Sequence, residues 1–260
     1  MSISSVFNED SFENSILQLL AGLNYNILQG YDIERDYHNP LYMDEFESSL
    51  YSINKDANPE AAQAAIEKLQ NIDIGSLEEM NDTFMYYLQN GVSVTYLENN
   101  EEVSTLIKLI DYENVENNTF TAINQWTVID KENKRPDIVI FVNGIPLVVV
   151  ELKSPSREET DVSEAYTQLK KYMKVIPSLF VYNAFCIMSD QATSKAGTIT
   201  SSEDRFMEWK TTDGSYENTR FASFDVLFEG IFEKNRFLDI LENFTLFSKE
   251  SSKYIKILAG

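Results

Sequence analysis

Apolar positions in the first 90 residues recur at intervals of three and four, which is the spacing of amphipathic helices. A first helix is expected from the apolar set Phe12, Ile16, Leu19, Leu20 and Leu23. Another is expected over the alanine-rich stretch 60–69, and a third begins after Ser76 and Glu79, which have the spacing of a capping box. Residues 1–90 are therefore expected to form a helical N-terminal part that packs on the core of the protein.

From Gly91 the pattern changes to alternation and short apolar runs, which are typical of strands. Such runs lie at 92–96, 103–110, 120–129, 138–142, 145–150 and 184–188. The runs Ile138–Val142 and Ile145–Val150 are almost wholly apolar, so we expect strands buried on both faces at the centre of a sheet. A helix is expected over about 161–175, and a Gly/Thr/Ser loop over 194–202. Residues 91–220 are thus expected to be the core.

After Phe221 the helical spacing returns, so residues 221–260 are expected to form a helical C-terminal segment. The whole pattern predicts an α/β protein of the α+β kind, in which helices flank a mixed central sheet and a further helical region precedes it. The sequence stops at Gly260 directly after an apolar stretch. We interpret this as a domain edge within a longer protein.

Composition limits what the chain can do alone. With 43% apolar and 12% aromatic residues it can bury a large core, which excludes general disorder. Its 42 acidic and 21 basic residues give a net charge of −21, which repels polyanions and predicts weak DNA affinity for this piece alone. Divalent cations and partner subunits relieve that repulsion, so a role on nucleic acid is not excluded.

The cysteine count and the hydropathy indicate the compartment. Cys186 is the only cysteine and lies within an apolar run, which excludes an internal disulfide and favours a reducing environment. No apolar stretch reaches the length of a bilayer span, and the N-terminus lacks the basic start and apolar core of a signal peptide. We expect a cytoplasmic protein without a membrane segment.

The strongest chemical signal is the stretch PDIVIFVNGIPLVVVELK, residues 136–153. Asp137 begins its first apolar run, and Glu151 and Lys153 follow the second, two residues apart and therefore on one strand face. Carboxylates are the hard oxygen ligands that Mg²⁺ prefers, and a lysine can place a water or stabilise developing negative charge. We interpret these residues as a phosphodiesterase site that uses Mg²⁺, for which Mn²⁺ can substitute.

The connection between the two strands decides whether Asp137 reaches this site. A plain two-residue turn would put Asp137 opposite Val150, with its side chain on the wrong face. A three-residue connection over 142–144, with Gly144 left-handed as a bulge, would pair Asp137 with Val149 and return it to the correct face. We therefore predict an odd-length connection or a bulge in this hairpin.

A simpler interpretation treats Asp137 as a strand-start or turn residue, and Glu151 and Lys153 as the point where a buried strand reaches the surface. Such short motifs are weak when taken alone. Charges that directly follow a buried central strand are costly unless a cation compensates them, and this favours the site.

The helix that follows supplies a second pair of polar side chains. Gln168 and Tyr172 are four residues apart and share a helix face. A solvated Gln and an interface Tyr would have the same spacing, so both interpretations stay open. Ser156 with Glu159, or Asp161, can cap this helix.

Taken together, the chain resembles the N-terminal nuclease domain of the restriction (HsdR) subunit of type I restriction-modification enzymes. The motifs that carry the resemblance are Asn81-x-x-Phe84 with GVSV, Asp137, Glu151-x-Lys153, RPDIVIFVNGIPLVVVELKSP, Gln168-x-x-x-Tyr172, SLFVYNAFCIMSD, KAGTI and Phe206-x-x-Trp209-Lys210. Each motif is short, but their order and intervals make the combination specific. The resemblance covers most of the chain and is least diagnostic between Tyr37 and Gly75.

This resemblance implies a PD-(D/E)xK nuclease fold. Asp137 and Glu151 would then be metal ligands and Lys153 the catalytic lysine. Gln168 and Tyr172 would assist near the active site, for instance through DNA contacts. Nucleases of this fold often present a further acid from the N-terminal helix, for which Glu13 is the candidate, and a solvated first-turn Glu is the alternative.

In that family the full subunit continues into an ATP-driven motor that translocates double-stranded DNA, and it works with methyltransferase (HsdM) and specificity (HsdS) subunits. This chain contains no GxxxxGK[ST], so ATP hydrolysis is not assigned to it. The expected function is a Mg²⁺-dependent DNA endonuclease domain. Two alternatives remain, namely a stand-alone repair or recombination nuclease of the same fold and a non-catalytic acidic docking module.

Three other residue types are weaker candidates. His38, the only histidine, lies in a polar segment and is expected in a surface turn. Lys170 and Lys171 can meet phosphates, although a solvated helix face explains them equally well. Ser189 and the other nearby serines lack a histidine base, which argues against serine hydrolase chemistry.

Overall fold

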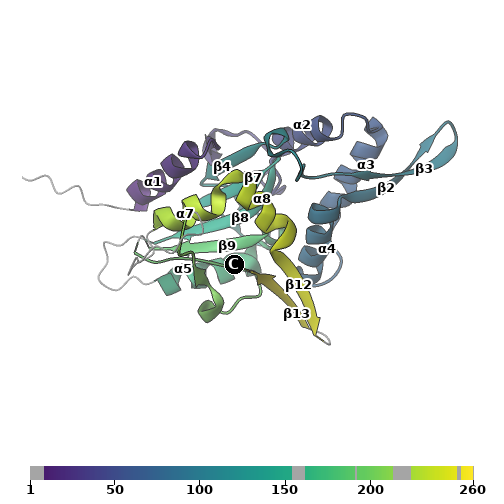
Figure 1. Cartoon of the computed structure of the whole chain (residues 1–260). Helices are drawn as coiled ribbons and strands as arrows, with labels where there is room; N and C mark the ends of the chain where they lie inside the picture. The colour runs from purple at the N-terminus through teal and green to yellow at the C-terminus, as the bar shows by residue number, and fades with distance from the viewer. Residues whose placement is uncertain (1–8, 154–161, 191, 213–223, 251–252, 260) are drawn as a thin grey trace, which may run out of the picture.

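The computed structural model describes residues 9–153, 162–190, 192–212, 224–250 and 253–259. Figure 1 shows a layer of strands with helices on both sides. The helices within these residues are α1 (Glu9–Gly22), α2 (Met43–Ile53), α3 (Pro59–Gln70), α4 (Leu77–Asn90), α5 (Val162–Val175), α6 (Pro177–Val181), α7 (Phe224–Phe232) and α8 (Lys234–Asn243), with short 3₁₀ turns at Gly30–Asp32, Val115–Asn117 and Glu203–Arg205. None of these helices combines the length and the apolarity that crossing a membrane requires.

A seven-stranded mixed sheet forms the centre of the molecule. Its strands, in spatial order, are β1 (Asn26–Gln29), β4 (Phe120–Asn124), β7 (Ile138–Val142), β8 (Ile145–Leu152), β9 (Phe185–Ser189), β10 (Ser194–Gly197) and β11 (Met207–Glu208). The pairs β1–β4 and β8–β9 are parallel, and the other pairs are antiparallel. Every residue of β7 and β8 is buried, which confirms that the two apolar runs are central strands.

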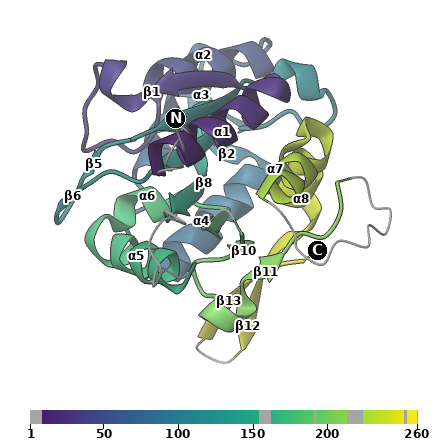
Figure 2. The same cartoon turned by 90° about the vertical axis from the view of Figure 1, so that its left-hand side faces the viewer.

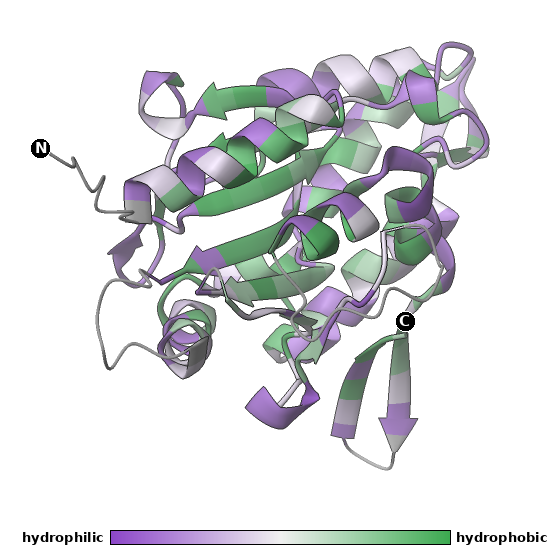
Figure 3. Ribbon diagram, turned by 60° about the vertical axis from the view of Figure 1, so that its left-hand side comes forward, coloured by the Kyte–Doolittle hydropathy of each residue, from purple (hydrophilic) through white to green (hydrophobic). Residues whose placement is uncertain are grey.

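Different helices cover the two faces of this sheet. Ile138, Ile140 and Val150 face a hydrophobic core that includes side chains of α1, α7 and α8. Val139 and Val149 face a second core, which includes side chains of α5 and α6. Because successive residues of a strand point to opposite faces, this division assigns each residue at the strand ends to one side. Figure 3 shows the resulting apolar strands between helices that are polar on their outer sides.

The N-terminal helices form as expected, and α4 begins with the predicted capping box. The Ser76 hydroxyl accepts from the Glu79 N–H at 3.3 Å, and the Glu79 carboxylate accepts from the Ser76 N–H at 2.7 Å. Residues 1–90 are not wholly helical, however. They also contribute β1 to the sheet, and its four residues are too few to produce a readable period-two pattern.

Within the described ranges, three two-stranded hairpins lie outside the central sheet. They are β2 (Val92–Glu98) with β3 (Glu101–Ile107), β5 (Val128–Ile129) with β6 (Asn133–Lys134), and β12 (Thr245–Glu250) with β13 (Lys253–Leu258). The β2–β3 hairpin projects from the body in Figure 1.

Two sequence-based expectations for these regions were therefore wrong. Residues 221–260 form the expected helices α7 and α8 but end in a β-hairpin, in which β12 pairs antiparallel with β13. The expected loop at 194–202 begins with β10, which pairs antiparallel with β9.

A buried lysine fastens the C-terminal hairpin to the body. The Lys256 ammonium donates to Asn81 Oδ1 at 2.7 Å and to the Asn183 carbonyl at 2.6 Å. Burial lowers the pKa of Lys256 well below its ordinary value. Nearby Cys186 is fully buried, and burial raises the pKa of its thiol to about 12, so it packs as a hydrophobic residue, as the sequence predicts.

Candidate active site

The turn between β7 and β8 has two residues, so of the two arrangements that we predicted, an odd-length connection or a bulge, the first is absent. Asn143 and Gly144 both have positive φ, 53° and 73°, and Val142 pairs directly with Ile145. Asn-Gly is the preferred sequence for such a turn. A Cβ on Gly144 would lie 2.4 Å from the Tyr42 carbonyl oxygen, so only glycine fits here.

A bulge inside β8 nevertheless restores the register that the site needs. Phe141 pairs with Pro146 but Ile140 pairs with Val148, which leaves Leu147 as the extra residue. Pro146 has no N–H to donate to the ladder, which explains why the pairing is interrupted there. The bulge is thus confirmed, but its predicted position at the turn was wrong.

The shifted register places Asp137 beside Glu151. Ile138 pairs with Val150, so continuing the register by one residue puts Asp137 opposite Glu151 and not opposite Val149, the pairing that a three-residue connection would have given. Directly opposed residues of an antiparallel pair share a face. The Leu152 N–H donates to Asp137 Oδ2 at 2.7 Å, which fixes the aspartate against the end of β8.

Lys153 completes the group. Its ammonium lies 2.7 Å from Glu151 Oε1, and its backbone N–H donates to the Ser189 carbonyl at 2.9 Å. The side chain of Glu151 is only 3% exposed and that of Lys153 19%, so the ion pair is largely removed from solvent. The three residues predicted as the site therefore meet at one end of the central strands, on the face that α5 covers.

Helix α5 adds Tyr172 and Gln168 to this group. Burial raises the pKa of Tyr172 above its ordinary value, and the charge of Glu151 raises it further. The hydrogen bond with Gln168 lowers this pKa, while the charge of Asp137 and a hydrogen bond with Glu151 raise it. Tyr172 is therefore a buried neighbour of both carboxylates, and Gln168 is held against it. The helix cap expected at Ser156, Glu159 or Asp161 lies outside the described residues.

The donor set fits a divalent cation. Asp137 and Glu151 supply two carboxylates from adjacent strands. No group of three or more His, Cys, Asp or Glu side chains is arranged to hold a metal in the part of the chain that the structure describes. Mg²⁺ is commonly bound by one or two carboxylates and keeps several waters, so this pair is a sufficient protein contribution.

Glu13 lies on the other face of the sheet at the same end. Its carboxylate is 8% exposed and accepts hydrogen bonds from the Asn124 amide at 2.6 Å and the Gln125 amide at 2.7 Å. It is therefore not a solvated first-turn residue. Gln125, which has φ of 53°, in turn donates its N–H to the Asp137 carbonyl at 2.8 Å. Glu13 is therefore linked to the site indirectly, through the side chain of Gln125 and the backbone hydrogen bond from Gln125 to Asp137.

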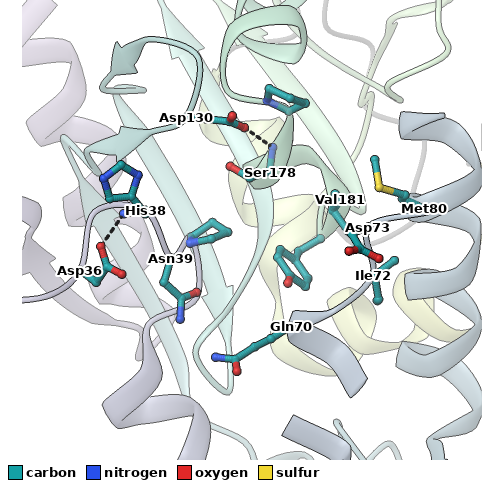
Figure 4. Close-up of a pocket in the computed structure, with 13 residues that line it drawn as sticks. Asp36, His38, Asn39, Gln70, Ile72, Asp73, Met80, Asp130, Ser178 and Val181 are labelled. Atoms are coloured by element: carbon teal, nitrogen blue, oxygen red, sulfur yellow. Dashed lines mark hydrogen bonds between the residues drawn. The ribbon is translucent and has the colours of Figure 1, made fainter. Parts of the chain in front are cut away.

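Two hollows differ in their relation to the site. One of about 380 Å³ is lined by Lys153, Gln168 and three residues at the start of α5, so it opens at the predicted site. Another of about 420 Å³ is shown in Figure 4 and is lined by Asp36, His38 and other residues, none of which belongs to that group. As predicted, His38 is exposed in a turn. Its backbone N–H donates to the Asp36 carboxylate at 2.9 Å.

Sequence reasoning missed the residues that brace the site from the neighbouring strand. Asn124 ends β4 and Gln125 follows it; they carry no motif, and their link to Glu13 spans more than 100 positions of the chain. The one local signal is that polar Asn-Gln directly follows the apolar stretch Phe120–Ile123. Such long-range pairs become visible only once the strand order is known.

Comparison with known proteins identifies the family. The family described as type I restriction enzyme R protein N terminus matches residues 6–205. The chain is 32% identical to the type I restriction enzyme HindI endonuclease subunit of Haemophilus influenzae over 269 residues, which cover 98% of this chain and 26% of that subunit. It is 31% identical over 271 residues to the putative type I restriction enzyme MjaIXP endonuclease subunit of Methanocaldococcus jannaschii, covering 94% of this chain and 26% of that protein.

The chain thus spans 26% of the length of each of these relatives. The family match agrees with the resemblance seen in the motifs, and the mixed sheet flanked by helices is consistent with a restriction-endonuclease-like nuclease domain. This protein belongs to the family of type I restriction enzyme R protein N-termini.

Proposed function

We propose that this chain is the Mg²⁺-dependent DNA endonuclease domain of a type I restriction enzyme R subunit. The observation that carries the proposal is the bulge at Leu147, which puts Asp137 opposite Glu151 with Lys153 beside them. The names of the relatives, which are endonuclease subunits, support the same class of reaction.

Each residue has a distinct role in this proposal. A bound divalent cation would neutralise phosphate charge and lower the pKa of a water molecule, and Asp137 and Glu151 would hold it. The Lys153 ammonium would orient the attacking water or stabilise the charge that develops on the phosphate oxygens. Tyr172 and Gln168 would fix the orientation of Glu151 through their hydrogen bonds.

Glu13 has a supporting role in this scheme. Both of its oxygens are already engaged by Asn124 and Gln125, which makes a positioning role more consistent with the geometry than direct metal ligation. By holding Gln125 in its left-handed conformation, Glu13 would fix the backbone contact to Asp137.

The remaining functions would come from the rest of the assembly. The net charge of −21 argues that double-stranded DNA is delivered by other parts, namely an ATP-driven motor and the methyltransferase and specificity subunits. Nothing in the sequence resembles a base-reading element, so the choice of cutting site would be imposed by those parts. We place this assembly in the cytoplasm.

Cleavage by the assembled enzyme tests the proposal. Asp137→Asn and Lys153→Ala are each expected to lower DNA cleavage by about a thousandfold or more, because each removes a group that acts on the charged transition state. ATP hydrolysis and translocation should be unchanged. Asp73→Asn, at an exposed aspartate in the hollow of Figure 4, is the matched control.

The possible outcomes separate the alternatives. Retained cleavage in Asp137→Asn would overturn the site. Cleavage by the isolated 260 residues would favour a stand-alone nuclease. A wild-type enzyme that translocates DNA and never cuts it would favour the acidic docking module.

A further inference from the structure

Basic side chains gather on one surface of this acidic protein. Residues 128–135 and 170–175 together contain six basic residues, Lys131, Lys134, Arg135, Lys170, Lys171 and Lys174, and two acidic residues, Asp130 and Glu132. The whole chain has the opposite balance, with 42 acidic and 21 basic residues. A local excess of basic residues in an acidic protein is typical of a surface that binds a polyanion.

The two segments form one surface because they touch. The Lys131 ammonium donates to the Lys174 carbonyl at 3.3 Å, and the Glu132 N–H donates to the Val175 carbonyl at 3.2 Å. The β5–β6 hairpin thus lies against the C-terminal end of α5, and both are seen on one side of the molecule in Figure 2.

Most of the charges on this surface are available to a ligand. Lys131, Arg135, Lys171 and Lys174 are exposed, and Lys134 is half-buried. The Glu132 carboxylate lies 2.7 Å from the Lys134 ammonium, and Lys134 and, less strongly, Lys171 lower its pKa, so it offsets part of the positive charge. Lys170 points elsewhere, since its ammonium donates to the Ile199 carbonyl at 2.9 Å.

The surface adjoins the candidate active site at two points. Arg135 precedes Asp137 by two residues, in the segment directly before β7. Lys171 precedes Tyr172, whose hydroxyl contacts Glu151. Lys171 and Lys174 are three apart and so lie on one helix face, while Tyr172 turns into the core.

We propose that Lys131, Lys134, Arg135, Lys171 and Lys174 form a cationic surface that binds the phosphate backbone of DNA next to the cutting site. This inference rests on the proposed nuclease function and adds the element that guides the strand to Asp137 and Glu151. The contacts are to phosphates, so they position the duplex without reading its sequence. The net charge of −21 predicts weak DNA affinity, but DNA would contact this surface, where the local charge is positive.

Protection of lysines from an amine-reactive reagent tests the proposal directly. The assembled enzyme carrying Asp137→Asn is mixed with uncut duplex DNA and ATP, labelled, and analysed by mass spectrometry. Lys131, Lys171 and Lys174 are expected to lose reactivity on addition of DNA. Lys55 and Lys108, which are exposed in connecting segments after α2 and β3, should not change.

A matched pair of variants gives the functional measure. Lys171→Ala/Lys174→Ala should lower cleavage at limiting DNA by about 30-fold at 0.15 M salt, since a slope of about −0.9 per phosphate makes each lost contact worth about fivefold. Lys55→Ala/Lys108→Ala should cleave normally. ATP hydrolysis should be unchanged in both, which shows that the variants fold and load DNA.

The outcomes distinguish this proposal from the one it rests on. Unprotected lysines in an enzyme that still cuts DNA would overturn the cationic surface and leave the nuclease assignment intact. Protection by the partner subunits before DNA is added would show a protein interface and would also overturn it. Normal cleavage by Asp137→Asn would instead overturn the nuclease site itself.

Discussion

At the scale of residues, the chemistry depends on the surroundings of one buried carboxylate. Glu151 is almost wholly removed from water, which is costly for an isolated carboxylate. Lys153 compensates it at 2.7 Å, and Tyr172 adds a hydrogen bond from α5. The sequence indicated these residues, because charges that directly follow a buried central strand are costly unless a cation compensates them. The role of Tyr172 was not settled by spacing, because its burial depends on how α5 packs.

Replacing one phenol by a phenyl group tests that role. Tyr172→Phe is expected to lower the cleavage rate about tenfold or more, since Glu151 loses a hydrogen bond that fixes its orientation. The free energy of unfolding should fall by no more than about 1.5 kcal/mol, the usual worth of one hydrogen bond. Single-turnover cleavage and urea denaturation measure the two effects.

Tyr166 supplies the control on the same helix, because its hydroxyl donates to the Ser201 carbonyl at 3.3 Å. Tyr166→Phe should lose stability similarly but cleave at the wild-type rate. Equal cleavage by both variants would refute a role for Tyr172 in the site.

At the scale of elements, the β7–β8 hairpin shows what a sequence can and cannot predict. The sequence predicted that the register between β7 and β8 shifts by an odd number of residues, because only such a shift brings Asp137 to the face of Glu151. The sequence did not predict where the register shifts, because a three-residue loop and an internal bulge both satisfy this condition. Pro146 was the physical clue, since it removes a ladder hydrogen bond within β8. The tight fit of Gly144 against α2 depends on tertiary contacts that no local pattern contains.

A Gly144→Ala variant tests the two-residue turn. Its methyl group would clash with the Tyr42 carbonyl and the Phe46 N–H, and φ of +73° disfavours any side chain. We expect the free energy of unfolding to fall by about 2 kcal/mol or more. Thermal unfolding is the measurement.

Gly22→Ala is the control, because a Cβ there meets nothing within 4 Å. It should be neutral or slightly stabilising. A Gly144→Ala protein as stable as wild type would contradict the turn.

At the scale of the whole molecule, the hydropathy pattern predicted the fold class and the central strands. It did not predict the side-chain contacts between residues that lie far apart in the sequence. Lys256 illustrates the difference, because its partners Asn81 and Asn183 lie 175 and 73 positions away. A sequence shows such a lysine as one more surface charge. The cationic surface was missed for the same reason, since β5–β6 and α5 are adjacent only in the fold.

The buried lysine gives a prediction about pH. Its folded pKa is lowered, so between that value and the ordinary 10.5 the unfolded state binds more protons than the folded state. The contribution of Lys256 to stability therefore rises with pH across that window. Cys186 and Asp82 face it and reduce the shift without reversing it.

Lys256→Met should remove this rise. The difference in unfolding free energy between wild type and Lys256→Met is expected to shift in favour of wild type as pH increases, measured by denaturant titration at several values up to pH 10. A difference that does not change with pH would show that Lys256 stays charged in the folded protein.

The most direct test of the account is whether Asp137 and Glu151 together hold a divalent cation. Mn²⁺ binding, followed by electron paramagnetic resonance, should reveal a tight site in the wild-type protein that is lost in Asp137→Asn/Glu151→Gln. The double variant Asp36→Asn/Asp73→Asn removes the same charge from the other hollow and should keep the site. Equal Mn²⁺ binding by the wild type and Asp137→Asn/Glu151→Gln would contradict the claim that the Leu147 bulge builds a metal site.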